Sequence, residues 1–198
     1  MTVSRMLRAA GLALILGLTA QDTTLAADSP PNSEFARDFS LLVPPVPAPL
    51  EVFTDLGGQR VRLADFEGQV LLVNFWATWC APCVQEMPAL ERLQAELAGE
   101  GLQVLAVSID RGGAKVVEPF AARLGLERLP LYLDPKSALS RAFGIAGLPT
   151  SFQINAEDPV IRQLSGAAEW DSDEAVELIR FYLKDGGENS GVQNAAAK

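Results

Sequence analysis

Two cysteines lie in the stretch NFWATWCAPCVQEMP, which runs from Asn74 to Pro88, and they are the only cysteines of the 198-residue chain. Cys80 and Cys83 are separated by Ala-Pro, a spacing that suits a redox-active dithiol. The same spacing also fits a structural disulfide, half of a zinc site, or two inert apolar side chains. The elements that position the pair help to choose between these interpretations.

The flanking sequence places Cys80 at the start of a helix. A near-continuous apolar run at Gln69–Ala77 predicts a buried strand, and the apolar spacing after it predicts an amphipathic helix at Ala81–Ala98. Backbone N–H groups at a helix N-terminus stabilise a thiolate, the attacking form in disulfide exchange. We therefore predict that Cys80 is the nucleophile. Cys83 lies one turn along the helix, where it would be more buried and would resolve a mixed disulfide.

Glu86 is a candidate proton acceptor for this reaction. It lies three residues beyond Cys83 and shares its side of the predicted helix. A partly buried carboxylate at that place could accept the Cys83 proton. A solvated helix residue is the alternative, and spacing alone favours it. The chain contains no histidine, which excludes Ser-His-Asp and Cys-His catalysis.

Metal and nucleic-acid functions are less well supported. Structural zinc needs four ligands, and the cysteine pair supplies two with nothing to complete the set. Copper could use both thiolates with Met87 as a third soft ligand, although Met87 also fits the apolar face of the helix. The net charge of −9 argues against a nucleic-acid partner. We expect neither a metal nor a cofactor beyond a redox-active Cys80–Cys83 disulfide.

Residues 1–27 have the pattern of a secretory signal peptide. Two arginines precede an apolar run of twelve residues, Ala9–Ala20, and small residues follow that would allow cleavage after Ala26 or Ala27. The run is shorter than the roughly 18 residues of a membrane span; an uncleaved N-terminal anchor is the alternative. We expect export to the periplasm, where disulfides persist. A disulfide closing so short a loop would stabilise the fold little, which favours a chemical role.

The rest of the chain predicts one mixed α/β domain. We expect this domain at residues 50–185, after a stiff proline-rich linker at 28–49 and before a disordered tail at 186–198. Besides the strand and helix above, the predicted elements are a hairpin around DLGGQ, strands at 102–110, 129–134, 149–154 and 159–166, and helices at 114–125, 136–144 and 171–184. This order predicts a mixed sheet with helices on both faces.

The segment NFWATWCAPC resembles the active-site strand and turn of thioredoxin-fold proteins, and WCAPCVQEMP is similar to the exported TlpA-like and ResA-like thiol–disulfide oxidoreductases. The resemblance covers about residues 50–184. It implies a thioredoxin-like fold with an N-terminal β-hairpin and a central helix–strand insertion at Gly112–Gly144. It also implies that Pro149, in the sequence GLPT, is a cis-proline beside the cysteine pair.

The resemblance implies a role for each matching residue. Cys80 would be the nucleophile, Cys83 the resolving thiol and Glu86 the acid that tunes them. The surface that binds a substrate would contain Trp79, Pro82, Leu148 and Pro149. The chain departs from thioredoxin itself, because Asn74 stands where thioredoxin has a buried aspartate and its lysine partner falls near Ala106. The proton path of thioredoxin is therefore missing.

The implied activity is that of an exported reductase of protein disulfides. In the family, such proteins serve cytochrome c maturation or copper delivery to cytochrome oxidase, so apocytochrome c or a copper chaperone is an expected client. A membrane electron-transfer protein would re-reduce the pair. Alternatives are a disulfide oxidase or isomerase and a copper-binding chaperone that uses the two cysteines. A peroxidase of the peroxiredoxin type fits poorly, because Thr78 is too close to Cys80 for the threonine of that site.

Overall fold

The fold was analysed in a computed structural model that describes residues 30–156 and 159–184. The predicted signal segment (1–27) and tail (186–198) lie outside the described residues. Within them the chain forms eight strands in one mixed sheet, in the order β1-β8-β7-β4-β5-β6-β2-β3. None of the helices in the described part is long and apolar enough to cross a membrane.

The centre of the sheet is the strand that leads to the cysteines. All seven residues of β4 (Val70–Trp76) are buried, as expected for a strand covered on both faces. It pairs in parallel with β5 (Leu102–Ser108) and antiparallel with β7 (Thr150–Ile154). Helix α2 (Ala81–Leu97) makes the crossover that two parallel strands require. The predicted strand–helix unit is therefore confirmed.

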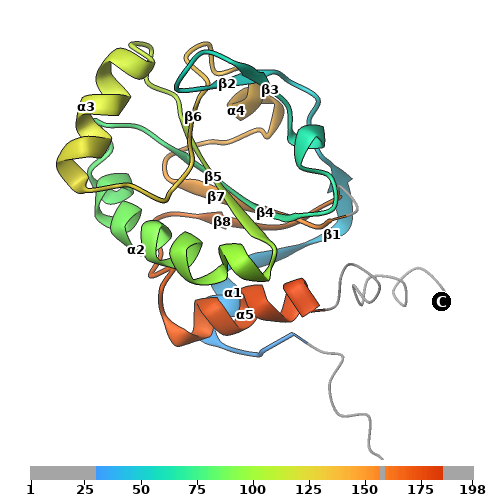
Figure 1. The fold of residues 1–198 in the computed structure, drawn as a ribbon. Coiled ribbons are helices and arrows are strands. Elements are labelled where there is room, and N and C mark those ends of the chain that lie inside the picture. The colour runs from blue at the N-terminus through green and yellow to red at the C-terminus, as the bar shows by residue number, and fades with distance from the viewer. Residues whose placement is uncertain (1–29, 157–158, 185–198) are drawn as a thin grey trace, which may run out of the picture.

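Helices cover both faces of this sheet, as predicted. One apolar cluster joins the sheet to α1 (Glu34–Asp38), α2, α3 (Ala114–Leu124) and α5 (Asp173–Lys184). The other joins the opposite face to α4 (Ala138–Ala142) and the 3-10 turn η1 (Leu63–Phe66). Figure 1 shows α1, α2 and α5 together on one side of the sheet and α4 on the other. Alternate residues of β4 belong to the two clusters, because successive side chains of a strand point to opposite faces of the sheet.

The predicted hairpin and the central insertion are both present. Strands β2 (Phe53–Asp55) and β3 (Arg60–Val61) pair antiparallel around the glycine turn. The insertion supplies α3 and β6 (Leu131–Leu133), and β6 lies in the sheet between β5 and β2. The chain returns through α4 to β7 and β8 (Pro159–Ser165), and Ser172 caps the closing helix α5 with its hydroxyl oxygen.

The segment predicted to be a linker is instead part of the fold. Residues 34–47 form α1 and β1 (Ser40–Pro47), and β1 pairs antiparallel with β8 at the edge of the sheet. Prolines are tolerated there because an edge strand need not donate all of its N–H groups. The register shifts between Leu41 and Val46, across the two consecutive prolines. Phe39, between the two elements, is fully buried, so the folded unit begins well before residue 50.

Candidate active site

Cys80 is positioned by the junction between β4 and α2. The turn 77–80 follows the strand, and Cys80 is the N-cap residue of α2, whose first turn contains Pro82. The sulfur of Cys80 accepts a hydrogen bond from the backbone N–H of Cys83 at 3.3 Å. The free N–H groups and the dipole of a helix N-terminus both favour negative charge at this sulfur. The local structure therefore suits a thiolate at Cys80.

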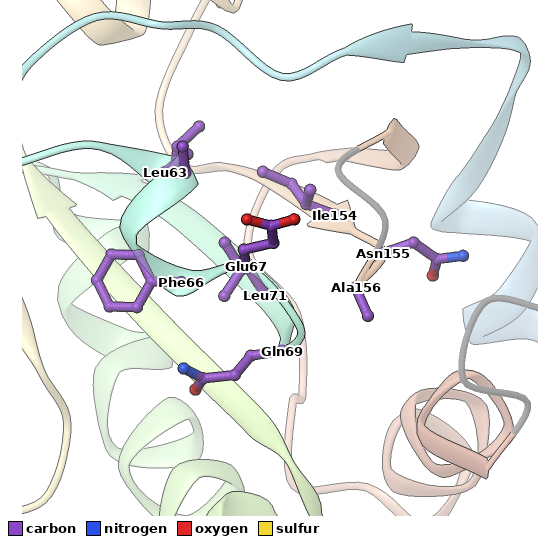
Figure 2. Close-up of a pocket in the computed structure, with 9 residues that line it drawn as sticks. Leu63, Phe66, Glu67, Gln69, Leu71, Ile154, Asn155 and Ala156 are labelled. Atoms are coloured by element: carbon purple, nitrogen blue, oxygen red, sulfur yellow. The ribbon is translucent and has the colours of Figure 1, made fainter.

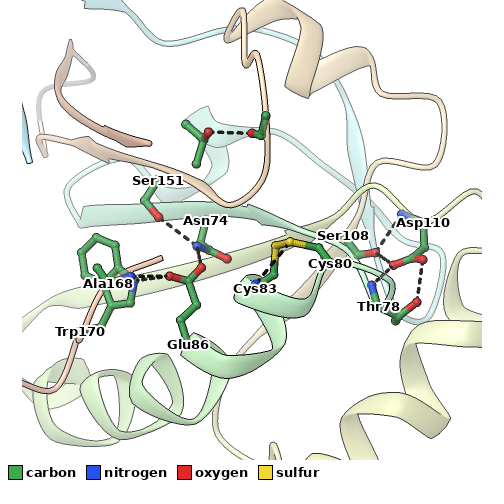
Figure 3. The surroundings of a disulfide bond; sticks show 12 residues. Asn74, Thr78, Cys80, Cys83, Glu86, Ser108, Asp110, Ser151, Ala168 and Trp170 are labelled. Carbon is green, nitrogen blue, oxygen red and sulfur yellow. Dashed lines mark hydrogen bonds between the residues drawn. A yellow bond between two sulfur atoms is a disulfide. The ribbon is translucent and has the colours of Figure 1, made fainter. Parts of the chain in front are cut away.

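Cys80 and Cys83 form a disulfide, with their Cα atoms 5.3 Å apart. The exposed fraction is 6% for Cys80 and 0% for Cys83, which agrees with the prediction that Cys83 is the more buried of the two. Figure 3 shows the bond at the first turn of α2, close to the end of β4. A partner molecule can therefore reach the sulfur of Cys80, whereas the sulfur of Cys83 has no contact with solvent.

Glu86 is buried, with 3% of its surface exposed, so the alternative of a solvated helix residue is wrong. One carboxylate oxygen accepts a hydrogen bond from the Asn74 side chain at 2.8 Å. The other accepts the backbone N–H of Ala168 and the indole N–H of Trp170, both at 3.1 Å. Burial raises the pKa of Glu86 from 4.5 to about 7, against the opposite effect of these hydrogen bonds. A carboxyl with this pKa can take or give a proton at neutral pH.

Asn74 connects Glu86 to the sheet. Its side-chain NH2 group donates both to Glu86 and to the hydroxyl of Ser151 on β7, at 2.8 and 2.9 Å. Figure 3 shows Glu86 directed from α2 toward Asn74 on β4. The amide oxygen of Asn74 is buried without a hydrogen-bond partner among the described residues. The side chains of Asn74 and Ser151 do not ionise, so Glu86 is the ionisable group among these three residues.

A second buried cluster holds the turn that carries Cys80. Asp110, at the end of β5, accepts hydrogen bonds at 2.8 Å from the backbone N–H and the hydroxyl of Thr78 and from the hydroxyl of Ser108. Asp110 is not among the site residues predicted from the sequence. Its position was nevertheless informative, because it follows a buried strand predicted beside β4, and the ends of neighbouring parallel strands meet at one edge of the sheet.

A groove of about 640 Å³ runs beside the exposed edge of Cys80. Three of the residues predicted to bind a substrate line it, namely Trp79, Pro82 and Leu148. The Trp79 side chain is 69% exposed, the kind of accessible aromatic surface found in binding sites. The groove also contains residues that the sequence analysis missed, which come from the segment around α4: Ser137, Ser140, Arg141, Ile145, Ala146 and Gly147.

Pro149 lies at the same edge of the sheet but is buried, and it is not among the residues that line the groove. The peptide bond between Leu148 and Pro149 is cis. The next residue, Thr150, begins β7 and pairs with Phe75 near the end of β4. The structure therefore brings Leu148 to the groove beside Cys80 and leaves Pro149 in the interior.

Two further features of the described residues bear on the alternatives to this site. A small cavity of about 180 Å³ lies between η1 and the end of β7, and Figure 2 shows the side chains that line it, including Glu67 and Asn155. It is at the opposite end of β4 from the cysteines. In the described part of the chain, no three Cys, Asp or Glu residues are grouped as metal ligands. Met87, the third ligand of the copper alternative, is fully buried in the core.

The chain resembles several known proteins over the region that contains this site. It matches the AhpC/TSA family over residues 33–163. It is 33% identical over 137 residues to the thiol-disulfide oxidoreductase ResA of Bacillus thuringiensis subsp. konkukian, and the match covers 69% of this chain and 75% of that protein.

Two crystal structures of Chlorobium tepidum proteins have the same fold. One is described as a thiol:disulfide interchange protein DsbE; it is 32% identical with a TM-score of 0.64 and covers 70% of this chain and 96% of its own. The other is a thiol:disulfide interchange protein of the thioredoxin family; it is 29% identical with a TM-score of 0.58 and covers 70% of this chain and 97% of its own.

Proposed function

The chain belongs to the AhpC/TSA family and is a thiol–disulfide oxidoreductase, and we propose that it acts as a reductase of disulfides in exported client proteins. The observation that carries the exchange chemistry is the unequal burial of the two bonded cysteines beside a groove. The reductive direction comes from the resemblance to TlpA-like and ResA-like proteins. Cys80 borders the groove at a helix N-terminus, and Cys83 is fully buried behind it. This arrangement suits one thiol that attacks a client and a second that acts only afterwards.

The reaction starts from the reduced pair. The Cys80 thiolate attacks one sulfur of a client disulfide, so that a new S–S bond to Cys80 forms, the client S–S bond breaks, and one client thiolate leaves. The Cys83 thiolate then attacks the Cys80 sulfur, which forms the Cys80–Cys83 disulfide and releases the second client thiolate. The client gains two electrons and the pair loses two. Because the dithiol itself carries these electrons, the exchange requires no cofactor.

Glu86 accepts the proton of Cys83 in the second step. The two residues are one helical turn apart on the buried side of α2. At neutral pH about half of a carboxyl group with a pKa of about 7 is ionised and can act as a base. No histidine is present to compete for this role. Glu86 thus takes the place of the proton path that thioredoxin has and this chain lacks.

The client docks in the groove, with Trp79, Pro82 and Leu148 as its apolar contacts. The client class comes from the resemblance to TlpA-like and ResA-like proteins, and is apocytochrome c or a protein of cytochrome oxidase copper assembly. The predicted signal segment supports a reaction in the periplasm, with the domain free or held by an N-terminal anchor. A membrane electron-transfer protein supplies the two electrons that restore the dithiol.

Trapping of the intermediate tests this proposal. A Cys83→Ser variant, mixed with a disulfide-bonded peptide, should accumulate a mixed disulfide through Cys80, whereas the matched Cys80→Ser variant should form none. Mass spectrometry identifies the adduct. The roles are reversed if only Cys80→Ser traps the peptide. The reductase proposal fails if the reduced wild-type protein leaves the peptide disulfide intact while the oxidised protein readily oxidises the peptide dithiol.

A further inference from the structure

Trp170 is a buried residue, far from the cysteines in sequence, that contacts the proposed proton acceptor. It lies between β8 and α5 and has no exposed surface. Its indole N–H donates to the carboxylate of Glu86 at 3.1 Å, and the backbone N–H of Ala168 donates to the same oxygen at 3.1 Å. Figure 3 shows the two donors on one side of Glu86, with Asn74 on the other.

The N-terminal segment, defined here as Glu34–Pro47, holds Trp170 in this orientation. The ring of Phe35 packs edge-on against Trp170 with centroids 5.4 Å apart, and the ring of Phe39 does so at 5.5 Å. Edge-to-face contacts at these distances fix the orientation of an aromatic ring as well as its depth. Phe39 is fully buried. The plane of the indole, and hence the direction of its N–H, depends on these two rings.

Buried polar contacts fix the N-terminal segment itself. The guanidinium of Arg162 on β8 donates to the backbone carbonyl oxygens of Ala36 and Phe39 and to the hydroxyl of Tyr182 on α5. Arg162 is 4% exposed and stacks near the Phe39 ring, with 6.0 Å between its central carbon and the ring centroid. If the segment moved so that either carbonyl oxygen were lost, an N–H donor of the buried Arg162 guanidinium would have no acceptor, which costs free energy. The position of Phe39 is therefore tightly determined.

We propose that the N-terminal segment is a support of the redox site, in which Phe35 and Phe39 orient Trp170 and Trp170 acts as a positioning residue for Glu86. This inference rests on the proposed role of Glu86 in the exchange reaction. It gives a function to a part of the chain whose composition predicts only a linker. It also connects the first helix and strand of the described chain to the cysteine pair.

The physical consequence is a tuned carboxyl group. A donor that bonds to a carboxylate favours the ionised form, so loss of the Trp170 N–H should raise the pKa of Glu86 above about 7. The side chains that bond to Glu86 are uncharged. Four acidic residues on the surrounding segments border a surface pocket outside this cluster, namely Glu34, Asp38, Glu169 and Glu174. The other charged groups nearby include Arg37 on α1, the ion pair of Arg92 with Asp171, and the buried Arg162, which bonds to Ala36, Phe39 and Tyr182. On α2 itself the titratable groups nearest in sequence are Cys83, which does not titrate while bonded, and Glu91, whose carboxylate accepts the backbone N–H groups of residues 127–129.

The first test is the Trp170→Phe variant, which keeps an aromatic ring and removes the N–H. Carbon-13 NMR of the Glu86 carboxyl in the oxidised protein reports its pKa without any need for activity. Loss of one hydrogen bond to the Glu86 carboxylate should raise the pKa of Glu86 by about one unit. The ionised fraction of Glu86 at pH 7 then falls by about fivefold. Trp76→Phe is the matched control, since Trp76 is equally buried but its N–H has no partner among the described residues.

The second test addresses the N-terminal segment. Phe39→Leu should also raise the pKa of Glu86, because the indole loses one of the rings that orient it. Phe53→Leu is the matched control, since Phe53 is 2% exposed and belongs to the apolar cluster on the opposite face of the sheet. Both variants should lower stability, but only Phe39→Leu should change the pKa. If both leave the pKa of Glu86 at the wild-type value, the N-terminal segment has no positioning role.

Kinetics separate this inference from the proposed role of Glu86. The rate of the Cys83 step, followed in protein with both cysteines as release of the second client thiol in a single turnover, should fall in Glu86→Gln, and Trp170→Phe should have no further effect in that background. If Glu86→Gln leaves this rate unchanged, the proton-acceptor role is wrong even when the NMR shifts are found. If Glu86→Gln slows the step but Trp170→Phe leaves both the rate and the pKa of Glu86 unchanged, the positioning inference is overturned.

Discussion

Replacement of Glu86 by glutamine should change the pH dependence of stability in a way that follows from the structure. The carboxyl is buried, and burial raises its pKa in the folded protein from 4.5 to about 7. The folded state therefore holds the Glu86 proton more tightly than the unfolded state. The contribution of Glu86 to stability is fully present below pH 4.5 and is lost as the pH rises through about 7.

The size of this loss follows from the shift of the pKa. A rise from 4.5 to about 7 is about 2.5 units, and each unit corresponds to about 1.36 kcal/mol, so wild-type protein should lose about 3 kcal/mol between these pH values through this one group. An amide at the same position does not titrate. It would cost about 1 kcal/mol at every pH, because its NH2 group faces the NH2 group of Asn74.

Urea unfolding of the oxidised protein at pH 4.5 and pH 8 measures the effect. The free energy of unfolding of Glu86→Gln, relative to wild type, should increase by about 3 kcal/mol between the two pH values. Glu118→Gln is the control, because it makes the same chemical change at an exposed position on α3. If Glu86→Gln and wild type show a constant difference across this range, Glu86 does not carry the raised pKa on which the account depends.

Two further predictions concern the groove and the support of α2. Trp79→Ala should raise the KM for a disulfide-bonded peptide by about tenfold, since it removes an exposed aromatic contact, and should change stability by less than about 0.5 kcal/mol; an unchanged KM would exclude Trp79 from the docking surface. Glu91 accepts backbone N–H bonds from Glu127, Arg128 and Leu129 at 3.2, 2.8 and 2.8 Å. Glu91→Ala should therefore cost about 2 kcal/mol and speed hydrogen exchange at these three amides, and slow exchange there would contradict it.

The sequence was most informative where a local pattern determines the structure. An apolar run followed by a proline-containing helix start was enough to place Cys80 at the N-terminus of α2, and the glycine turn was enough to predict the β2–β3 hairpin. Both features depend on residues close together in the chain. The greater burial of Cys83 followed from its place on the apolar side of the same helix.

The contacts that surround Glu86 could not be predicted in this way. Trp170 is 84 residues from Glu86, and a buried tryptophan has no local signature of its hydrogen-bond acceptor. The N-terminal segment was misinterpreted because its prolines are typical of a stiff linker. Edge strands accept prolines, and Phe35 and Phe39 were the strong apolar signals that the segment packs against the core. Both the bonds to Glu86 and the pairing of the N-terminal segment with β8 depend on residues far apart in the sequence.

The reduction potential of the Cys80–Cys83 pair tests the central claim most directly. Equilibration of the protein with glutathione or dithiothreitol buffers, followed by quantification of the free thiols, gives the value. The account predicts a potential near or below that of thioredoxin, about −270 mV, as expected for a reductant that depends on a dedicated electron donor. A potential near that of the strong oxidant DsbA, about −120 mV, would contradict the reductase proposal and indicate that the pair donates disulfides.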